Sequence, residues 1–258
     1  MMLTVKAVYD WVDGFAPFQT AEEYDNAGLL TGRFDMPVTR ILTALDCTME
    51  VVEEARRLKA ELILTHHPLM FHARKNLRED DPEGRIICAL IRSHIALICA
   101  HTNLDRAPGG INDVLTQIFS LTQVRGDGFI RCGKLPAGIT AKELRDIASR
   151  LLKAPVRLYG SQDMKIETFA VGSGAFDEGF EEAAAYGAQA YLTGEVRHHN
   201  ALNAVAQGMV LLEGGHFATE APGLSAFGGC LQKGLDRLQY SVAVFDYSGV
   251  PYPGALDR

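Results

Sequence analysis

Two adjacent histidines follow a short apolar run, and their position is the first sign of chemistry in the chain. His66 and His67 stand in the sequence T-H-H-P at 65–68, which comes directly after residues 61–64. Neighbouring side chains of a regular strand point to opposite faces, and proline cannot continue a central strand. The strand is therefore expected to end here, where the two imidazoles can serve one metal ion or two. An isolated pair of histidines is more often an ordinary loop feature, so other residues must decide.

Polar side chains also follow three other apolar runs. Asp46 follows one run, the sequence H-T-N-L-D at 101–105 follows a second, and E-G-G-H at 213–216 follows a third. Ligands of open α/β sheets bind outside the carboxyl ends of the strands, so we expect these side chains to converge. If segment 101–105 is extended, its first, third and fifth side chains, including His101 and Asp105, point to one side.

A Gly-Gly turn leads into what is predicted to be a helix start at His216. Glu220 then lies one turn further along the same face. An imidazole and a carboxylate at this spacing can hold an ion together, as half of an H-E-x-x-H motif does. Viewed alone, a capping histidine and a solvated glutamate explain the pair equally well.

The strand ends together offer imidazole and carboxylate ligands. Three imidazoles and two carboxylates among them would form a mixed ligand set for metal. Nitrogen and oxygen donors suit Zn, Fe, Mn, Ni or Co, and five ligands are too many for one closed tetrahedral site. Two ions that share a bridging carboxylate fit better, and such pairs are typical of metal-assisted hydrolysis.

Elements that position these residues alternate along both halves of the chain. Apolar runs at 40–45, 62–64 and 95–100 alternate with helical patterns at 49–58 and 85–93. Later runs at 169–171, 190–192 and 209–212 alternate with helical patterns at 178–186 and 198–206. Between the halves, two strands are predicted around a helix over 141–152 that Thr140 caps. These βαβ units predict parallel or mixed sheets covered by helices.

Composition excludes several classes of protein. The chain has 258 residues, 47% of them hydrophobic, and a formal net charge of -7, whereas a nucleic-acid binder needs a basic face. Its five cysteines show no C-x-x-C spacing, which suits reduced thiols. The N-terminal residues contain no apolar signal segment. We therefore expect a soluble, cytoplasmic protein with neither nucleic acid nor a membrane as partner.

Six short motifs together resemble one known family. They are D-N-A-G-L at 25–29, L-D at 45–46, T-H-H-P-L at 65–69, A-H-T-N-L-D at 100–105, G-E-V at 194–196 and G-H-F-A-T-E at 215–220. The third and fourth motifs in this order are highly specific, and the set spans nearly the whole chain. The chain resembles the GTP cyclohydrolase I type 2 homologue family, also called NIF-three-like, in its short bacterial form.

The resemblance implies an α/β fold of two intertwined, similar lobes with mixed, mostly parallel sheets covered by helices. The first lobe would comprise residues 1–125, with the segment from about 221 to 258 packing back on it. The second would comprise residues 126–220, and no middle domain would be inserted. The resemblance also implies a ring-shaped homohexamer with a dinuclear metal centre.

The resemblance assigns the two divalent transition-metal ions their ligands residue by residue. His67 and Asp105 would hold one ion, His66 and His216 would hold the other, and Glu220 would bridge both.

Other polar residues of the same motifs are candidates for different roles. His101 and Glu195 are the candidate catalytic groups for proton transfer, although a structural histidine explains His101 equally well. Phe217 stands where many relatives have a second histidine. His198 and His199 follow the G-E-V motif at an expected helix start, where surface histidines are the simpler interpretation.

The implied function is hydrolysis of a small molecule, either purine ring opening of GTP or cleavage of a related phosphorylated compound. A phosphodiesterase or amidohydrolase with another substrate is an alternative, as is a non-catalytic metal-binding or interaction protein. The G-S-G at 172–174 could cradle a phosphate, but Asp177 replaces the third glycine of the dinucleotide fingerprint. No independent sign of guanine recognition is present.

Overall fold

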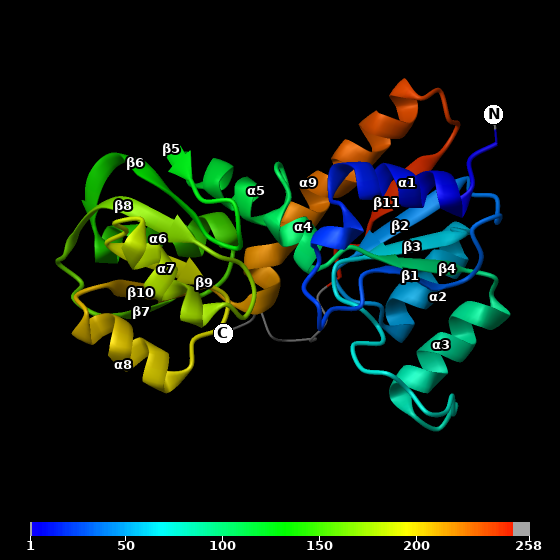
Figure 1. Cartoon of the computed structure of the whole chain (residues 1–258), viewed down its shortest axis with the longest axis horizontal. Coiled ribbons are helices and arrows are strands. Elements are labelled where there is room, and N and C mark those ends of the chain that lie inside the picture. Colours follow the sequence, from blue (N-terminus) through cyan, green and yellow to red (C-terminus); the bar gives the residue numbers. More distant parts are fainter. Residues whose placement is uncertain (1, 250–258) are drawn as a thin grey trace. The chain divides into compact units, whose positions relative to one another are not determined.

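The computed structural model describes residues 2–249 of an α/β protein with two sheets (Figure 1). Of these residues, 2–107 and 224–249 form one compact unit, and 108–223 form a second. The predicted α/β fold with two helix-covered mixed sheets is confirmed. Residues 250–258, which were expected to belong to the returning C-terminal segment, lie outside the described residues.

The first unit is built on a five-stranded sheet. Its strand order is β1 (Gly28–Thr31), β4 (Ala96–Cys99), β3 (Leu62–Thr65), β2 (Arg40–Ala44) and β11 (Ala243–Asp246). All neighbouring pairs are parallel except β1 with β4. The carboxyl ends of β2, β3 and β4 therefore meet at one edge of the sheet, as the sequence predicts.

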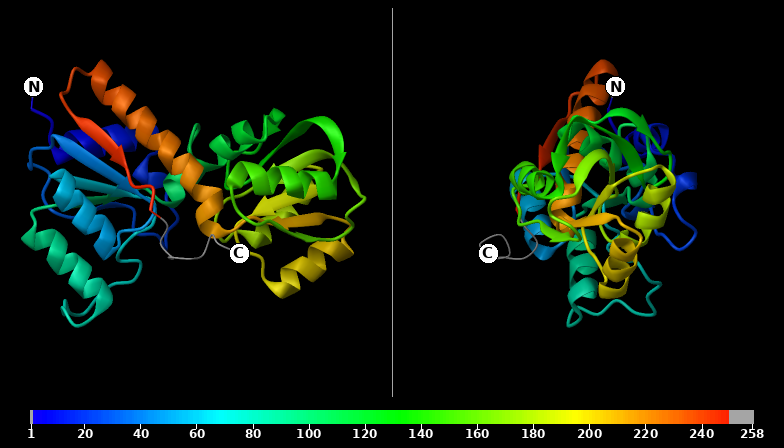
Figure 2. Two further views of the ribbon diagram at one scale, coloured as in Figure 1. Left: turned by 180° about the vertical axis from the view of Figure 1, so that it is seen from behind. Right: turned by 90° about the vertical axis from the view of Figure 1, so that its left-hand side faces the viewer.

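Helices cover both faces of this sheet. Figure 1 shows α2 (Met49–Leu58) and α3 (Pro82–Arg92) on one side of it and α1 (Val5–Phe15) on the other. The last part of α9 (His216–Arg237) packs beside α1, where the rings of Phe227 and Trp11 lie 5.9 Å apart (Figure 2). The unit also contains the 3-10 helix η1 (Phe18–Thr20) and the short helix α4 (Thr102–Arg106). α9 itself begins in the second unit and ends in the first.

The second unit is built on a six-stranded sheet. Its strand order is β5 (Thr122–Arg125), β6 (Arg131–Thr140), β8 (Lys165–Val171), β9 (Ala190–Thr193), β10 (Val210–Glu213) and β7 (Arg157–Tyr159). The three strands β8, β9 and β10 are parallel, and the outer strands are antiparallel to their neighbours. The unit begins at Pro108 rather than near residue 126, because Leu115 and Phe119 pack in the core of this sheet and β5 pairs with β6.

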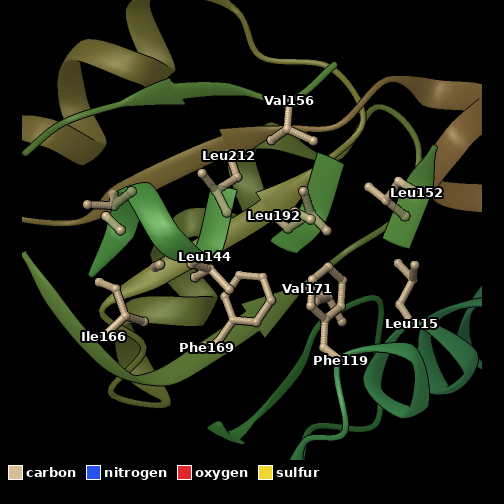
Figure 3. Close-up of a cluster of buried hydrophobic side chains, with 14 of the residues drawn as sticks. Leu115, Phe119, Leu144, Leu152, Val156, Ile166, Phe169, Val171, Leu192 and Leu212 are labelled. Atoms are coloured by element: carbon tan, nitrogen blue, oxygen red, sulfur yellow. The ribbon is translucent and has the colours of Figure 1, made fainter. Parts of the chain in front are cut away.

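The core of the second unit lies on both faces of its sheet. On one face, α5 (Ile111–Ile118) and α6 (Ala141–Leu152) pack on strand residues that include Phe169 and Val171 (Figure 3). Ala170 points to the other face, where η2 (Asp177–Gly179), α7 (Phe180–Ala185) and α8 (His198–Ala206) lie. Each large apolar side chain buried in this way stabilises the fold by about 1.5–3 kcal/mol.

Local capping explains why α6 begins at residue 141, as the sequence predicts. The side chain of Thr140 accepts a hydrogen bond from the backbone of Glu143, whose carboxylate bonds back to the Thr140 backbone. This reciprocal capping box satisfies two donors at the start of α6.

None of the described helices has both the length and the apolar character needed to cross a bilayer.

Candidate metal centre

Three histidines of the first unit cluster where β3 and β4 end. His66 and His67 follow β3 directly, and His101 precedes α4. Ring nitrogen atoms of the three side chains lie within 4.8 Å of one another, a grouping that could hold a metal ion. The ring centroids of His66 and His67 are 5.1 Å apart. The side chains of these consecutive residues therefore lie in the same cluster. The expected convergence of these two strand ends is confirmed.

Each imidazole of this cluster is oriented through its Nδ1 atom. The acceptors are Ala100 O for His66 (2.9 Å), Asp46 Oδ1 for His67 (2.8 Å) and Asp25 Oδ1 for His101 (2.8 Å). Carbonyl and carboxylate oxygens only accept hydrogen bonds, so Nδ1 carries the proton in each ring. Nε2 is then the nitrogen suited to metal ligation, as in other carboxylate–histidine–metal arrangements.

The carboxyl pKa of Asp25, beside the cluster, is well below its usual value. Its buried carboxylate accepts hydrogen bonds from the His101 ring, from the backbone N–H of Thr102 at 3.1 Å and from the Thr102 hydroxyl at 2.5 Å. Burial by itself raises the pKa of Asp25, but these hydrogen bonds outweigh burial and lower it to about 2. The carboxylate therefore stays ionised and keeps His101 in place.

This low pKa predicts a loss of stability in acid. The folded-state pKa of Asp25 is below the value of about 4 for an unfolded chain, so its ionised form stabilises the fold above pH 4. That contribution, about 2 kcal/mol, is lost as the pH falls from about 4 through 2. Urea unfolding of the wild type and of Asp25→Asn at several pH values measures it. Equal pH dependence of the two proteins between pH 5 and 2 would contradict this assignment.

Asp105 reaches the cluster from a helix rather than from an extended segment. The expectation of an extended 101–105 segment is wrong, because residues 102–106 form α4 and the Asp105 N–H donates to His101 O at 3.1 Å. Asn103 favours the turn: its Oδ1 accepts from His101 N at 2.9 Å, and its Nδ2 donates to Ala16 O at 2.7 Å. Asp105 is buried, and its Oδ1 lies 3.5 Å from Nε2 of His66.

The second unit presents another imidazole and carboxylate at the start of α9. The predicted helix start is confirmed, and His216 Nε2 lies 3.2 Å from Oε1 of the buried Glu220 one turn later. Glu195 Oε1 accepts from Nδ1 of His216 at 2.7 Å, so this ring is oriented like those of the first unit. Gly174 gives the carboxylate room, because a Cβ atom at this position would overlap Glu220 Oε1.

The remaining residues singled out in the sequence have other surroundings. His198 and His199 are exposed at the start of α8. Asp177 accepts hydrogen bonds from the Arg197 backbone at 2.7 Å and from Asn200 Nδ2 at 2.9 Å, which fixes the beginning of α8.

The G-S-G segment at 172–174 does not form a phosphate cradle. Its three backbone N–H groups donate to Leu192 O at 2.9 Å, Asn112 Oδ1 at 2.8 Å and Thr219 Oγ1 at 3.1 Å. A phosphate-binding loop needs such groups to be available to the ligand.

The donor chemistry of both units fits divalent transition-metal ions. Imidazole nitrogens and carboxylate oxygens are the donors in each unit. The thiol of Cys47, the residue after Asp46, is buried, and burial raises its pKa to about 12. Asp46 was expected at this edge of the sheet, but neither it nor Asp25 was predicted to hold a histidine, although both stand in the motifs that carry the resemblance.

Comparison with known proteins agrees with the fold and the motifs. Residues 3–251 match the model of a family described as Duf34/NIF3 (NGG1p interacting factor 3). A Clostridium acetobutylicum protein named GTP cyclohydrolase 1 type 2 homolog is 33% identical over 249 residues, which cover 92% of this chain and 93% of that protein. A Streptomyces coelicolor protein of the same name is 34% identical over 226 residues, covering 82% and 79% of the two chains.

A solved structure agrees as well. The crystal structure of a hypothetical protein from Staphylococcus aureus superposes with a TM-score of 0.92 at 27% identity and covers 98% of this chain and 99% of its own. The structure of a Bacillus cereus protein related to NIF3 has the same fold, with a TM-score of 0.94 at 21% identity over 98% and 99% of the two chains. The chain belongs to the Duf34/NIF3 family.

Proposed function

We propose that this protein is a metal-dependent hydrolase whose two donor sets bind divalent transition-metal ions. His66, His67 and Asp105 would supply ligands from the first unit, and His216 and Glu220 from the second. The observation that carries the proposal is the orientation of these histidines, each of which has Nδ1 on an oxygen acceptor. This arrangement presents Nε2 to a metal and is typical of metal-binding histidines.

The proposed centre is dinuclear, with Glu220 as the bridging ligand. The two side chains at the start of α9 are fewer than the roughly four ligands that zinc takes, so this set needs donors from elsewhere. The family resemblance supports a shared pair of ions, and the nitrogen and oxygen donors suit Zn, Fe, Mn, Ni or Co. When bound, such ions supply Lewis acid catalysis.

We also propose the ring-shaped homohexamer that the resemblance implies, which native mass spectrometry would detect as six chains of 28.2 kDa.

Two further side chains would assist the reaction. His101 is held by Asp25 at 2.8 Å, and its ring lies 5.2 Å from that of His66, so its Nε2 is placed to exchange a proton with a substrate there. Glu195 holds Nδ1 of His216 and would act by orienting that ring.

Relatives named GTP cyclohydrolase 1 type 2 homolog support GTP or another phosphorylated small molecule as the first substrate class to test.

The function is tested with metal-loaded protein and a substrate panel of GTP, other nucleotides, phosphodiesters and amides. Turnover of GTP would give a formylated pyrimidine product or its hydrolysis products, and Asp105→Ala should lower the rate at least about 100-fold. His199→Ala is the matched control, because this exposed histidine should leave the rate unchanged. Turnover of another class would identify a phosphodiesterase or amidohydrolase. No turnover by fully loaded protein would favour a non-catalytic metal-binding protein.

A further inference from the structure

Two exposed aromatic side chains stand beside the histidine cluster of the first unit. Tyr24 is 64% exposed and Phe71 is 41% exposed. Their ring centroids lie 6.2 Å apart, and the Phe71 ring lies 6.3 Å from that of His101. Single exposed apolar residues are normal on protein surfaces, but adjacent aromatic rings next to candidate catalytic groups are a different feature.

Hydrogen bonds also fix the backbone next to both rings. Asn26 Nδ2 donates to the carbonyl oxygen of Met70, the residue before Phe71, at 2.5 Å. Asp25, the residue after Tyr24, is held by His101 and Thr102. Because the backbone is held while the side chains face solvent, a ligand can contact these rings without first ordering the chain.

Exposed aromatic rings can bind planar heterocycles by stacking. Every nucleobase has a π face, and stacking on an aromatic side chain contributes about 1–3 kcal/mol per base. An aliphatic or purely charged substrate would gain little from these rings. The edge-on contact of Phe71 with His101, at an interplanar angle of 83°, places the proton-transfer candidate next to this apolar surface.

We propose that Tyr24 and Phe71 form a binding site for a nitrogen-containing heteroaromatic ring of the substrate, such as a purine or pyrimidine base. The proposal rests on the hydrolase function above, because it names the substrate class for that site. Tyr24 and Phe71 are specificity-determining residues in this scheme, and His101 lies at the edge of the bound ring.

The test compares two probes that differ only by the ring. Inosine 5′-monophosphate and ribose 5-phosphate are titrated calorimetrically into metal-loaded protein. We expect Phe71→Leu and Tyr24→Leu each to weaken nucleotide binding roughly 5- to 100-fold and to leave ribose 5-phosphate binding unchanged. Phe71→Tyr and Tyr24→Phe keep a ring and should retain binding, which separates stacking from misfolding.

Phe34→Leu is the matched control. Phe34 is 43% exposed, and its ring lies 5.3 Å from that of the half-buried Tyr9. It is therefore an exposed phenylalanine whose aromatic neighbour is a tyrosine rather than a histidine. This variant should bind both probes like the wild type. Equal weakening by Phe34→Leu, unchanged nucleotide binding by the two test variants, or no nucleotide binding by the wild type would overturn the proposal. A change in the oligomer mass of Phe71→Leu in native mass spectrometry, with nucleotide affinity retained, would also overturn the proposal. It would identify Phe71 as part of a contact between copies of the chain.

Binding and turnover separate this proposal from the proposed function. Ring-dependent binding lost in Phe71→Leu, without hydrolysis of any substrate, supports the aromatic site and refutes the hydrolase. Hydrolysis with an unchanged KM for nucleotides in Phe71→Leu refutes the aromatic site and supports the hydrolase.

Discussion

Glu220→Ala is expected to lower the metal content of the purified protein from about two ions per chain to fewer than one. Glu220 is 3% exposed, and its Oε1 lies 3.2 Å from Nε2 of His216. As the proposed bridging ligand it would contact both ions, so its loss should affect both. Glu220→Gln should have a similar effect, because a neutral amide is a poor bridging ligand. Elemental analysis after exhaustive dialysis and metal reconstitution gives the ratio directly.

Asp177→Asn is the control for this prediction. Asp177 is another buried carboxylate of the second unit, but its partners are Arg197 and Asn200. Its replacement should lower stability and leave the metal content per folded chain unchanged. A Glu220→Ala protein that melts like the wild type and still holds both ions would rule out the bridging role.

Gly194→Ala is expected to destabilise the second unit by about 3 kcal/mol. A Cβ atom at this position would lie 2.6 Å from Gly174 O and 2.8 Å from Cα of His216. Both are backbone atoms, so no side-chain rotation relieves the overlap, and the segments that carry the site must separate. The Gly194 N–H also donates to Gly174 O at 2.8 Å, and separation would strain this hydrogen bond. Urea denaturation measures the loss, and metal affinity should fall in parallel because His216 is displaced.

Gly187→Ala separates steric overlap from backbone strain. Gly187 has a φ of +78°, and nothing lies within 4 Å of an added Cβ. Its substitution carries only the left-handed backbone penalty of about 1 kcal/mol. If both alanine variants lost the same stability, the close approach at Gly194 would not be the cause.

Local sequence signals predicted the helices with clear caps and apolar periods. The helices over 49–58, 141–152 and 198–206 have the predicted bounds. Thr48 and Thr140 cap the first two of them with their side chains. Such signals act within a few residues, so they can be recognised without knowledge of the tertiary structure.

Long-range pairings were not predicted. β11 pairs with β2, so residues 243–246 lie beside residues 40–43, and β1 joins β4 in the opposite direction. Strand pairing of this kind depends on contacts between segments distant in sequence, which periodicity does not contain. The predicted boundary between the units near residue 125 differs from the observed one at 108 for the same reason, since α5 and β5 belong to the second unit through their contacts with its sheet.

The histidine cluster could be predicted in part because strand ends bring polar residues together. The period-two argument for residues 101–105 failed because Asn103 caps a turn and α4 follows. The orienting roles of Asp25 and Asp46 could not be deduced from spacing, because these residues lie 76 and 21 positions from the histidines they contact. The motifs marked both aspartates without revealing their partners.

The hydrogen bonds that orient the three histidines of the first unit would determine when the proposed metal ions can bind. Their acceptors lie 21, 34 and 76 positions away along the chain, so they form only after β2, β3, β4 and the segment around residue 25 have assembled. An unfinished chain offers these imidazoles without fixed tautomers or directions. Metal acquisition is therefore expected to follow folding rather than drive it, in contrast to zinc fingers, which fold around their ion. In the cell, the choice of metal would then be made by the finished protein, from the ions available after its synthesis.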